Sequence, residues 1–162
     1  MKFVVDGMLG KLARWLRMMG DDVEYSTSMD DPELLEIAKK EHRVLLTRDF
    51  SLYQQAVAKG VEAHYVEGKT EQEKLAELAA RFGINLEIDM ATSRCPKCNT
   101  PIKSAPIEKV ADRVEKSTLE RVTKFWECPK CGQVYWQGAH WTKIRETLEN
   151  SMSLLKQRKG NV

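Results

Sequence analysis

The chain has 162 residues, of which 42% are hydrophobic and 31% are charged. This length suits one ordinary domain, or one compact domain with a small appendage, and the composition is that of a soluble globular protein. The formal net charge of +2 does not by itself indicate a nucleic-acid binder, so any attraction to phosphate depends on local clusters of basic side chains.

Strands and helices are expected to alternate over residues 1–83. The apolar run at 2–5 predicts a strand, and apolar residues at helical spacing predict a helix over 8–20 that ends at Gly20. The expected elements that follow are a strand at 22–26, a helix at 32–41, a strand at 43–47, a helix at 50–60, a strand at 61–67 and a helix at 71–82. This alternation predicts an α/β fold: a small parallel sheet with helices on both faces.

No stretch approaches the ~20 apolar residues that a membrane span requires. Asp6 interrupts the apolar N-terminal run, and no small-residue cleavage site follows it. The run therefore suits a first strand better than a signal peptide. We expect a cytoplasmic protein with no membrane partner, in a reducing compartment where thiols persist as thiols or bind metal.

From residue 95 the pattern changes to cysteine pairs, Cys95-Pro-Lys-Cys98 and Cys128-Pro-Lys-Cys131. Each pair can present two sulfurs to one ion, and two pairs complete the closed tetrahedral shell of a structural zinc site. Two disulfides are the main alternative, but they need an oxidising compartment. A redox role fits one lone pair better than two matched pairs. A closed shell leaves no position for a substrate, so the chemistry is expected elsewhere.

These patterns predict three parts of the chain. Residues 1–90 form the α/β domain, residues 91–150 form a four-cysteine zinc ribbon, and residues 151–162 form a basic, frayed tail. The charged segment between the two cysteine pairs is expected to be partly helical or loosely ordered.

Three aspartates fall where parallel sheets gather ligands. Asp6 and Asp49 follow expected strands, and Asp31 lies at the start of a helix. Converging carboxylates repel each other unless a divalent cation such as Mg²⁺ or Mn²⁺ neutralises them. Such an ion can activate water and hold phosphate oxygens. Nearby basic side chains that could contact phosphate are Lys11, Arg14, Arg17 and Arg48.

Each of these residues also has a structural interpretation. An aspartate after a strand is often a turn former or a helix cap, and Pro32 strengthens the capping interpretation for Asp30 and Asp31. Either of these two could face the site while the other caps. A basic helix face is usually only solvated, and Trp15 is more often a core residue than a stacking platform. Spacing alone leaves these alternatives open.

Three motifs are more specific in combination than alone. They are F-V-V-D-G-M-L-G-K-L-A-R-W-L-R-M-M-G at 3–20, L-L-T-R-D at 45–49, and C-P-x-C…F-W-x-C-P-x-C-G-x-x-Y-W-x-G-x-H-W at 95–141. With these motifs the chain resembles the Mut7-C family, prokaryotic and archaeal proteins that look like PIN-domain ribonucleases with a fused zinc ribbon. The resemblance extends from Phe3 to about Leu148.

The resemblance implies a PIN-like fold, metal-dependent endoribonuclease activity and RNA as the partner. It matches Asp6, Asp31 and Asp49 to catalytic acids that bind Mg²⁺ or Mn²⁺, and it matches Arg14, Arg17 and Arg48 to basic positions of the family pattern. PIN nucleases usually gather four acids, and here the fourth is Asp21, Asp22 or Glu33, or is absent. PIN domains often pair, which makes a homodimer one option for this chain, and the protein partner is unknown.

Aromatic residues crowd the second cysteine pair: Phe125, Trp126, Tyr135, Trp136, His140 and Trp141. They are expected to pack over the zinc and against the main domain. The alternative is that some of them, with Lys97, Lys130 and Lys143, stack on single-stranded RNA. Since four cysteines already fill the zinc shell, His140 is expected to be structural or to contact RNA.

Two other functions compete with a nuclease. A non-catalytic RNA-binding or adaptor protein would keep the fold without a competent acid cluster, and the missing fourth acid favours it. A receiver-like signalling domain would need a phosphoacceptor aspartate at a central strand and a partner lysine late in the sheet. The zinc ribbon and the family resemblance both speak against a receiver.

Overall fold

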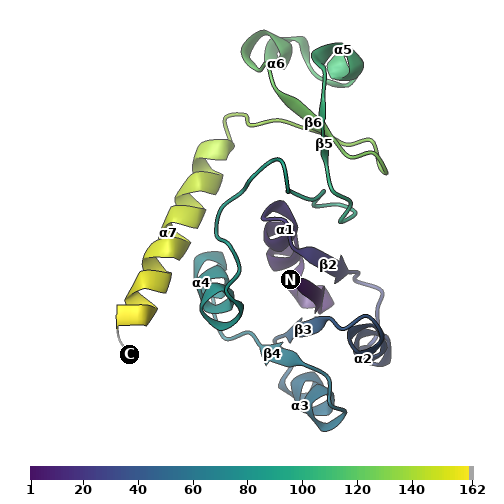
Figure 1. Ribbon diagram of the computed structural model, residues 1–162, viewed down its shortest axis with the longest axis vertical. Helices are drawn as coiled ribbons and strands as arrows, with labels where there is room; N and C mark the ends of the chain where they lie inside the picture. The colour runs from purple at the N-terminus through teal and green to yellow at the C-terminus, as the bar shows by residue number, and fades with distance from the viewer. Residues whose placement is uncertain (161–162) are drawn as a thin grey trace.

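The computed structural model describes residues 1–160, and it contains two separate sheets (Figure 1). The first is a four-stranded parallel sheet in the order β2-β1-β3-β4. Its strands are β1 (Lys2–Val5), β2 (Asp22–Tyr25), β3 (Val44–Thr47) and β4 (Ala63–Tyr65). The predicted α/β class, a parallel sheet flanked by helices with a separate cysteine module, is confirmed.

Helices cover both faces of the parallel sheet. They are α1 (Gly10–Met18), α2 (Asp31–Lys40), α3 (Phe50–Ala58) and α4 (Glu71–Phe82), and a short 3-10 turn, η1 (Gly7–Leu9), precedes α1. Successive strand residues point to opposite faces. Phe3 and Val5 accordingly pack in the core formed with α1 and α4, whereas Val4 packs in the core formed with α2 and α3. Both faces are therefore buried, as parallel sheets require.

The ends of these helices follow their sequence signals. Asp30 caps α2, since its Oδ1 accepts the Glu33 N–H at 2.9 Å. Thr70 caps α4 in the same way through Glu73. Gly83 ends α4 in the left-handed conformation, with φ of 70°, where glycine carries no steric penalty. The cap of α2 is thus Asp30, which leaves Asp31 available for another role.

The second sheet belongs to the cysteine module. It is antiparallel, in the order β5-β6-β7, with β5 (Lys103–Ala105), β6 (Phe125–Glu127) and β7 (Val134–Tyr135). The charged insert forms three short helical pieces, α5 (Ile107–Val110), η2 (Ala111–Arg113) and α6 (Lys116–Arg121). A small core around Phe125 and Val110 joins the insert to this sheet.

The C-terminal segment differs from the predicted frayed tail. Residues Trp141–Gly160 form one helix, α7, that runs from the cysteine module back along α4 (Figure 1). Leu148 and Ser151 are buried, and Met152 and Leu155 pack against the core of the parallel sheet. The helix therefore crosses the predicted boundary at residue 150, while residues 161–162 of the predicted tail lie outside the described residues. None of the helices in residues 1–160 combines the length and the apolar character that a membrane span needs.

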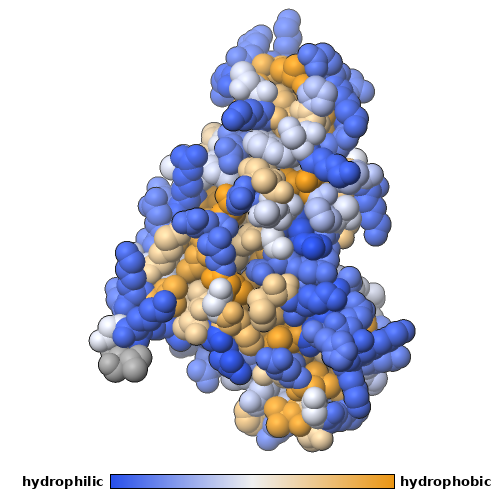
Figure 2. Space-filling view, in the orientation of Figure 1, coloured by the Kyte–Doolittle hydropathy of each residue, from blue (hydrophilic) through white to orange (hydrophobic). Residues whose placement is uncertain are grey.

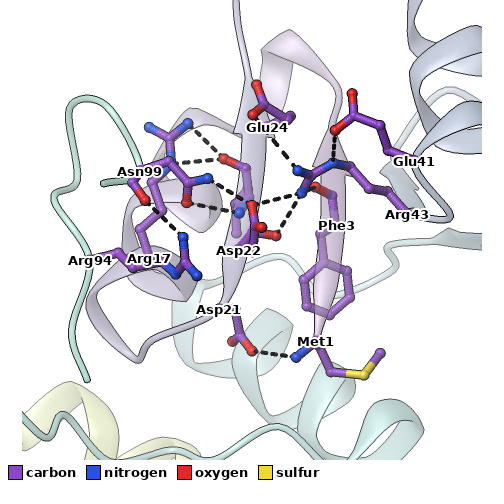
Figure 3. A network of polar contacts seen from close by, with 11 residues as sticks. Met1, Phe3, Arg17, Asp21, Asp22, Glu24, Glu41, Arg43, Arg94 and Asn99 are labelled. Atoms are coloured by element: carbon purple, nitrogen blue, oxygen red, sulfur yellow. Dashed lines mark hydrogen bonds and ion pairs between the residues drawn. The ribbon is translucent and has the colours of Figure 1, made fainter. Parts of the chain in front are cut away.

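Polar contacts attach the first cysteine pair to the edge strand β2 (Figure 3). The Val23 N–H, which faces away from β1, donates to Asn99 Oδ1 at 2.9 Å. Asn99 Nδ2 also donates to Asp22 Oδ1 at 2.8 Å, and the same carboxylate accepts from the buried Arg43 guanidinium at 2.8 Å. An edge strand with unpaired backbone groups invites pairing with other chains. Here the Asn99 side chain occupies part of that edge.

Candidate metal sites at the sheet edge and in the cysteine module

The four cysteines form a compact sulfur cluster. The Sγ atoms of Cys95 and Cys131 are 3.7 Å apart, those of Cys98 and Cys128 are 3.3 Å apart, and all four lie within 4.8 Å of one another. Four Zn–S bonds of about 2.3 Å in a tetrahedron place sulfurs ~3.8 Å apart. The cluster therefore fits the size and chemistry of an ion such as zinc, and the cysteines could bind such a metal.

Neighbouring groups hold these sulfurs in place. The Tyr135 hydroxyl lies 2.9 Å from Cys95 Sγ, and the Cys131 N–H donates to Cys128 Sγ at 3.4 Å. Burial raises the pKa of Cys95 to about 11. Burial also disfavours the Cys98 thiolate, but hydrogen bonds from Thr100 and the neighbouring thiols lower the pKa of Cys98 to about 6. Contacts of this kind to metal-binding sulfurs orient the ligands.

The second candidate site lies at the carboxyl edge of the parallel sheet. From β1 the chain crosses to β2 on one side and then returns past β1 to β3 on the other. The crevice between β1 and β3 is thus the topological switch point, where open α/β sheets bind ligands. Asp6 directly follows β1, and Asp49 follows β3 by two residues. Both predicted acids therefore flank this crevice.

Thr47, which is not among the residues predicted from the sequence, connects these two acids. Its hydroxyl donates to Asp6 Oδ2 at 2.8 Å and accepts the Asp49 N–H at 2.9 Å. The Thr47 side chain is fully buried, so this geometry is fixed. The sequence feature that could have indicated Thr47 is the hydroxyl residue of the L-L-T-R-D motif, directly before the arginine.

The turn after Asp6 is fixed from β2. The Tyr25 hydroxyl donates to the Gly7 carbonyl at 3.1 Å. A Cβ at Gly10 would lie 2.5 Å from that hydroxyl, so only glycine allows this approach without displacing the tyrosine. Gly7 and Gly10, two of the three glycines of the first motif, therefore help to hold Asp6 at the mouth of the crevice.

Asp31 shares the electrostatic environment of the other two acids. Burial raises the pKa of Asp31, and the negative charges of Asp49 and Asp6 raise it further. The carboxylate oxygens of the three aspartates are nevertheless more widely spaced than the four cysteine sulfurs. In residues 1–160, the four cysteines are the only group of three or more potential ligands within 4.8 Å of one another. The structure brings the acids to one edge of the sheet, and their role as metal ligands stays a prediction.

The three candidates for a fourth acid lie away from the crevice or face solvent. Asp21 and Asp22 stand at the amino end of β2, where Asp21 pairs with the terminal amine of Met1 at 3.6 Å and Asp22 pairs with Arg43. Glu33 lies in the first turn of α2 with an exposed side chain. Asp21 and Asp22 are thus excluded by their position at the opposite edge of the sheet.

The predicted basic residues separate into exposed and buried groups. Lys11 and Arg14 are exposed on α1. Arg48 lies beside Asp49 and donates to the Gly68 carbonyl at 2.5 Å, in the loop that follows β4. Glu77 holds the other side of this loop by accepting the Gly68 N–H at 2.8 Å. Arg48 therefore both borders the crevice and fastens a neighbouring loop.

Arg17 has a structural role in place of the predicted RNA contact. Its side chain is only 5% exposed. Nε and Nη2 donate to the Val23 carbonyl at 3.0 and 2.8 Å, and Nη1 donates to the Pro96 carbonyl at 2.8 Å. The guanidinium thus joins α1, β2 and the first cysteine pair, and its donors are directed into the protein.

Two modules therefore define the class of protein. One is a parallel α/β domain with acids at its topological switch point, and the other is a cysteine module shaped for a metal ion. The chain belongs to the family of the Mut7-C RNAse domain, whose model matches residues 1–148. This confirms the resemblance seen in the sequence motifs and indicates a nuclease-like protein. No curated protein and no solved structure matches the chain.

Proposed function

We propose that this protein is a metal-dependent endoribonuclease whose reaction takes place at the crevice between β1 and β3. The observation that supports the proposal is the position of Asp6, Asp49 and Asp31 at one edge of the sheet, where the Thr47 hydroxyl bonds both the Asp6 carboxylate and the Asp49 N–H. Membership in a family described as an RNAse domain supports the choice of RNA.

The three aspartates would hold one or two Mg²⁺ or Mn²⁺ ions, which suit oxygen ligands. When bound, such an ion lowers the pKa of water and neutralises charge on the phosphate. Lys11, Arg14 and Arg48 would hold the RNA backbone. Hydrolysis forms a bond from water oxygen to phosphorus and breaks the bond from phosphorus to the leaving ribose oxygen, which takes up a proton.

The test is cleavage of single-stranded and structured RNA by the full chain with Mg²⁺, with Mn²⁺ and without either ion. We expect Asp6→Asn and Asp49→Asn each to lower the rate about 100-fold or more, since a lost ligand removes several kcal/mol of charge stabilisation. Both variants should fold. Asparagine has the shape of aspartate. It can also replace Asp49 as the N-cap of α3, where Oδ1 accepts the Leu52 N–H at 3.2 Å.

The matched control is Asp112→Asn, because Asp112 is an exposed acid in the cysteine module. It should cleave at the wild-type rate. If a chelator is used to remove Mg²⁺ or Mn²⁺, it can also remove zinc from the cysteines. The zinc content of every sample therefore needs measurement, so that the two effects are distinguished. Equal activity in Asp6→Asn and Asp112→Asn would contradict the proposed site.

Thr47→Val gives a second prediction for the same site. Valine keeps the shape of threonine but loses the hydroxyl that fixes Asp6 and leaves the Asp49 N–H without its acceptor. We expect cleavage to fall 10–100-fold, as when a group that orients metal ligands is removed. Thr47→Ser restores the hydroxyl and should recover most of the rate. A serine variant as inactive as the valine variant would show that the hydroxyl is not the cause.

We also propose that the cysteine cluster holds one structural zinc ion, which would stabilise the module and help it bind RNA. Four cysteines fill a tetrahedral shell and leave no position for water or substrate. Catalysis is therefore assigned to the acids. Isolated protein should contain one zinc per chain by elemental analysis, and Cys128→Ser should contain less.

The alternative is a non-catalytic RNA-binding adaptor. It is favoured by the wide spacing of the acids, since within residues 1–160 the four cysteines are the only group of three or more potential ligands that lie within 4.8 Å of one another. RNA binding without metal-dependent cleavage would select it. A receiver domain is disfavoured, because the described parallel sheet has four strands and the receiver-type order has five. Pairing of two chains stays a prediction.

A further inference from the structure

A groove with basic side chains in its walls lies between α1 and α7. On the face of the molecule drawn in Figure 2, hydrophilic residues surround scattered apolar patches. The groove has a volume of about 490 Å³, and its walls include Lys11, Arg14 and Trp15 from α1, Lys143 from the first turn of α7, and His140 just before that helix. None of Lys11, Arg14 and Lys143 forms an ion pair with another residue in the described part of the chain. Three free cations in one groove complement a polyanion.

The groove opens at the edge of the sheet that carries the acids. α1 begins four residues after Asp6, and the 3-10 turn η1 joins the two. The first turn of α4, which supplies Glu71 to the groove, likewise follows the carboxyl end of a strand, β4. Glu71 is the acid of the groove, and it is paired with Lys74 at 3.3 Å. A nucleic-acid backbone lying in the groove would therefore lead to the crevice between β1 and β3.

A second cavity opens beside this groove and is mostly apolar. It has a volume of about 210 Å³, and Met18, His140 and Ile144 line both cavities. Trp136 and Trp141 form further walls. The cavity is smaller than the ~300 Å³ of the smallest drug-sized pockets and suits one flat ring system. Apolar and aromatic walls of this kind receive unstacked bases.

We propose that the groove between α1 and α7 holds single-stranded RNA, with phosphates on Lys11, Arg14 and Lys143, and that the apolar cavity receives one unpaired base. This inference rests on the proposed ribonuclease function and specifies the form of its substrate. A duplex would not supply the base, because its bases are stacked and paired. The combination of cations with aromatic walls favours RNA over an acidic peptide, which has no base to insert.

The first test measures binding without cleavage. The Asp6→Asn protein, loaded with zinc and without Mg²⁺ or Mn²⁺, is titrated with a uridine strand at several salt concentrations. The strand is about ten nucleotides long, a length comparable to the ~4–16 nucleotides that one OB fold covers on single strands. The variant Arg14→Gln/Lys143→Gln should lower the slope of log affinity against log salt by about 1.4, because each lost phosphate contact removes about 0.7. The matched control is Lys59→Gln, an exposed cation at the end of α3 on the opposite face of the sheet.

An unchanged slope in the double variant, or an equal change in Lys59→Gln, would overturn the groove as the RNA path. Displacement of RNA by a polyglutamate peptide of equal charge would overturn RNA as the occupant. The base site is tested with 2-aminopurine placed at successive positions of the strand. We expect one position whose fluorescence is strongly quenched by the tryptophans, and uniform fluorescence at all positions would overturn the base site.

The inference and the proposed function fail in different ways. Normal RNA binding in the groove without metal-dependent cleavage would overturn the nuclease proposal but not the proposal that the groove binds RNA. The opposite result is metal-dependent cleavage that is lost in Asp6→Asn, with unchanged RNA affinity in the groove variant. It would overturn the groove as the RNA site but not the nuclease proposal.

Discussion

Replacing Arg17 with alanine is expected to destabilise the protein by about 3 kcal/mol, the size of effect seen when buried hydrogen-bonding groups lose a charged partner. The guanidinium is 5% exposed and supplies three hydrogen bonds to the carbonyls of Val23 and Pro96. Burial lowers the pKa of Arg17, but arginine stays protonated in proteins. The variant leaves these carbonyls without donors and opens a cavity beneath the first cysteine pair. For a chain of this length the melting temperature should fall by roughly 6–12 °C.

Arg14 provides the matched control on the same helix. It is exposed and takes part in no ion pair within residues 1–160, so Arg14→Ala should change the free energy of unfolding by no more than about 0.5 kcal/mol. Urea unfolding followed by circular dichroism measures both variants. RNA affinity should show the opposite difference: Arg14→Ala should reduce it more than Arg17→Ala does. Equal stability of the two variants would contradict the structural role of Arg17.

Helix geometry explains why Arg17 does not share the exposed surface with Lys11, although the sequence pattern grouped the two as RNA contacts. Lys11, Arg14 and Arg17 recur every three residues, and a step of three turns the side chain by about −60° around an α-helix. Two steps place Arg17 about 120° from Lys11, on the side of Ala13 and Leu16, which are buried. A spacing of three keeps neighbours adjacent but does not keep a whole series on one face.

The parallel sheet could be predicted because its strands are short apolar runs alternating with helical patterns. The position of the acids followed from the same rule, since residues after parallel strands share one edge. Thr47 could not be chosen, because hydrogen bonds to both Asp6 and Asp49 depend on β1 and β3 being neighbours. The pairing of β1 with β3 cannot be predicted from the order of the strands along the chain, because β2 lies between them in the sequence.

The C-terminal helix was missed for a different reason. Its last residues, 156–160, are polar or small, and this composition suggested a frayed tail. Ile144, Leu148, Met152 and Leu155 nevertheless recur at helical spacing along the segment, and they pack against the core of the parallel sheet. The basic residues occupy the exposed side of the same helix. Periodicity over the whole segment carried more information than the composition of its end.

Removal of zinc is expected to have the largest effect on stability. Zinc binding by small cysteine modules contributes about 10–16 kcal/mol of apparent free energy, and the core around Cys95, Cys128 and Ile102 is small. Chelation should therefore unfold the module. It should also free the edge strand β2, since Asn99, one residue after Cys98, accepts the Val23 N–H at 2.9 Å. An exposed edge of this kind promotes association between chains.

Hydrogen exchange of single amides separates this local effect from global unfolding. The Val23 amide should exchange faster after chelation, and the Leu45 amide should stay protected, because it donates to the Glu62 carbonyl within the parallel sheet. Cys128→Ser should reproduce the pattern without a chelator. Slow exchange at Val23 after complete loss of zinc would mean that Asn99 is held by the fold alone. Fast exchange at both amides would mean that the metal supports the whole chain, because the contacts of Asn99 and Arg17 would then couple the two modules into one unit.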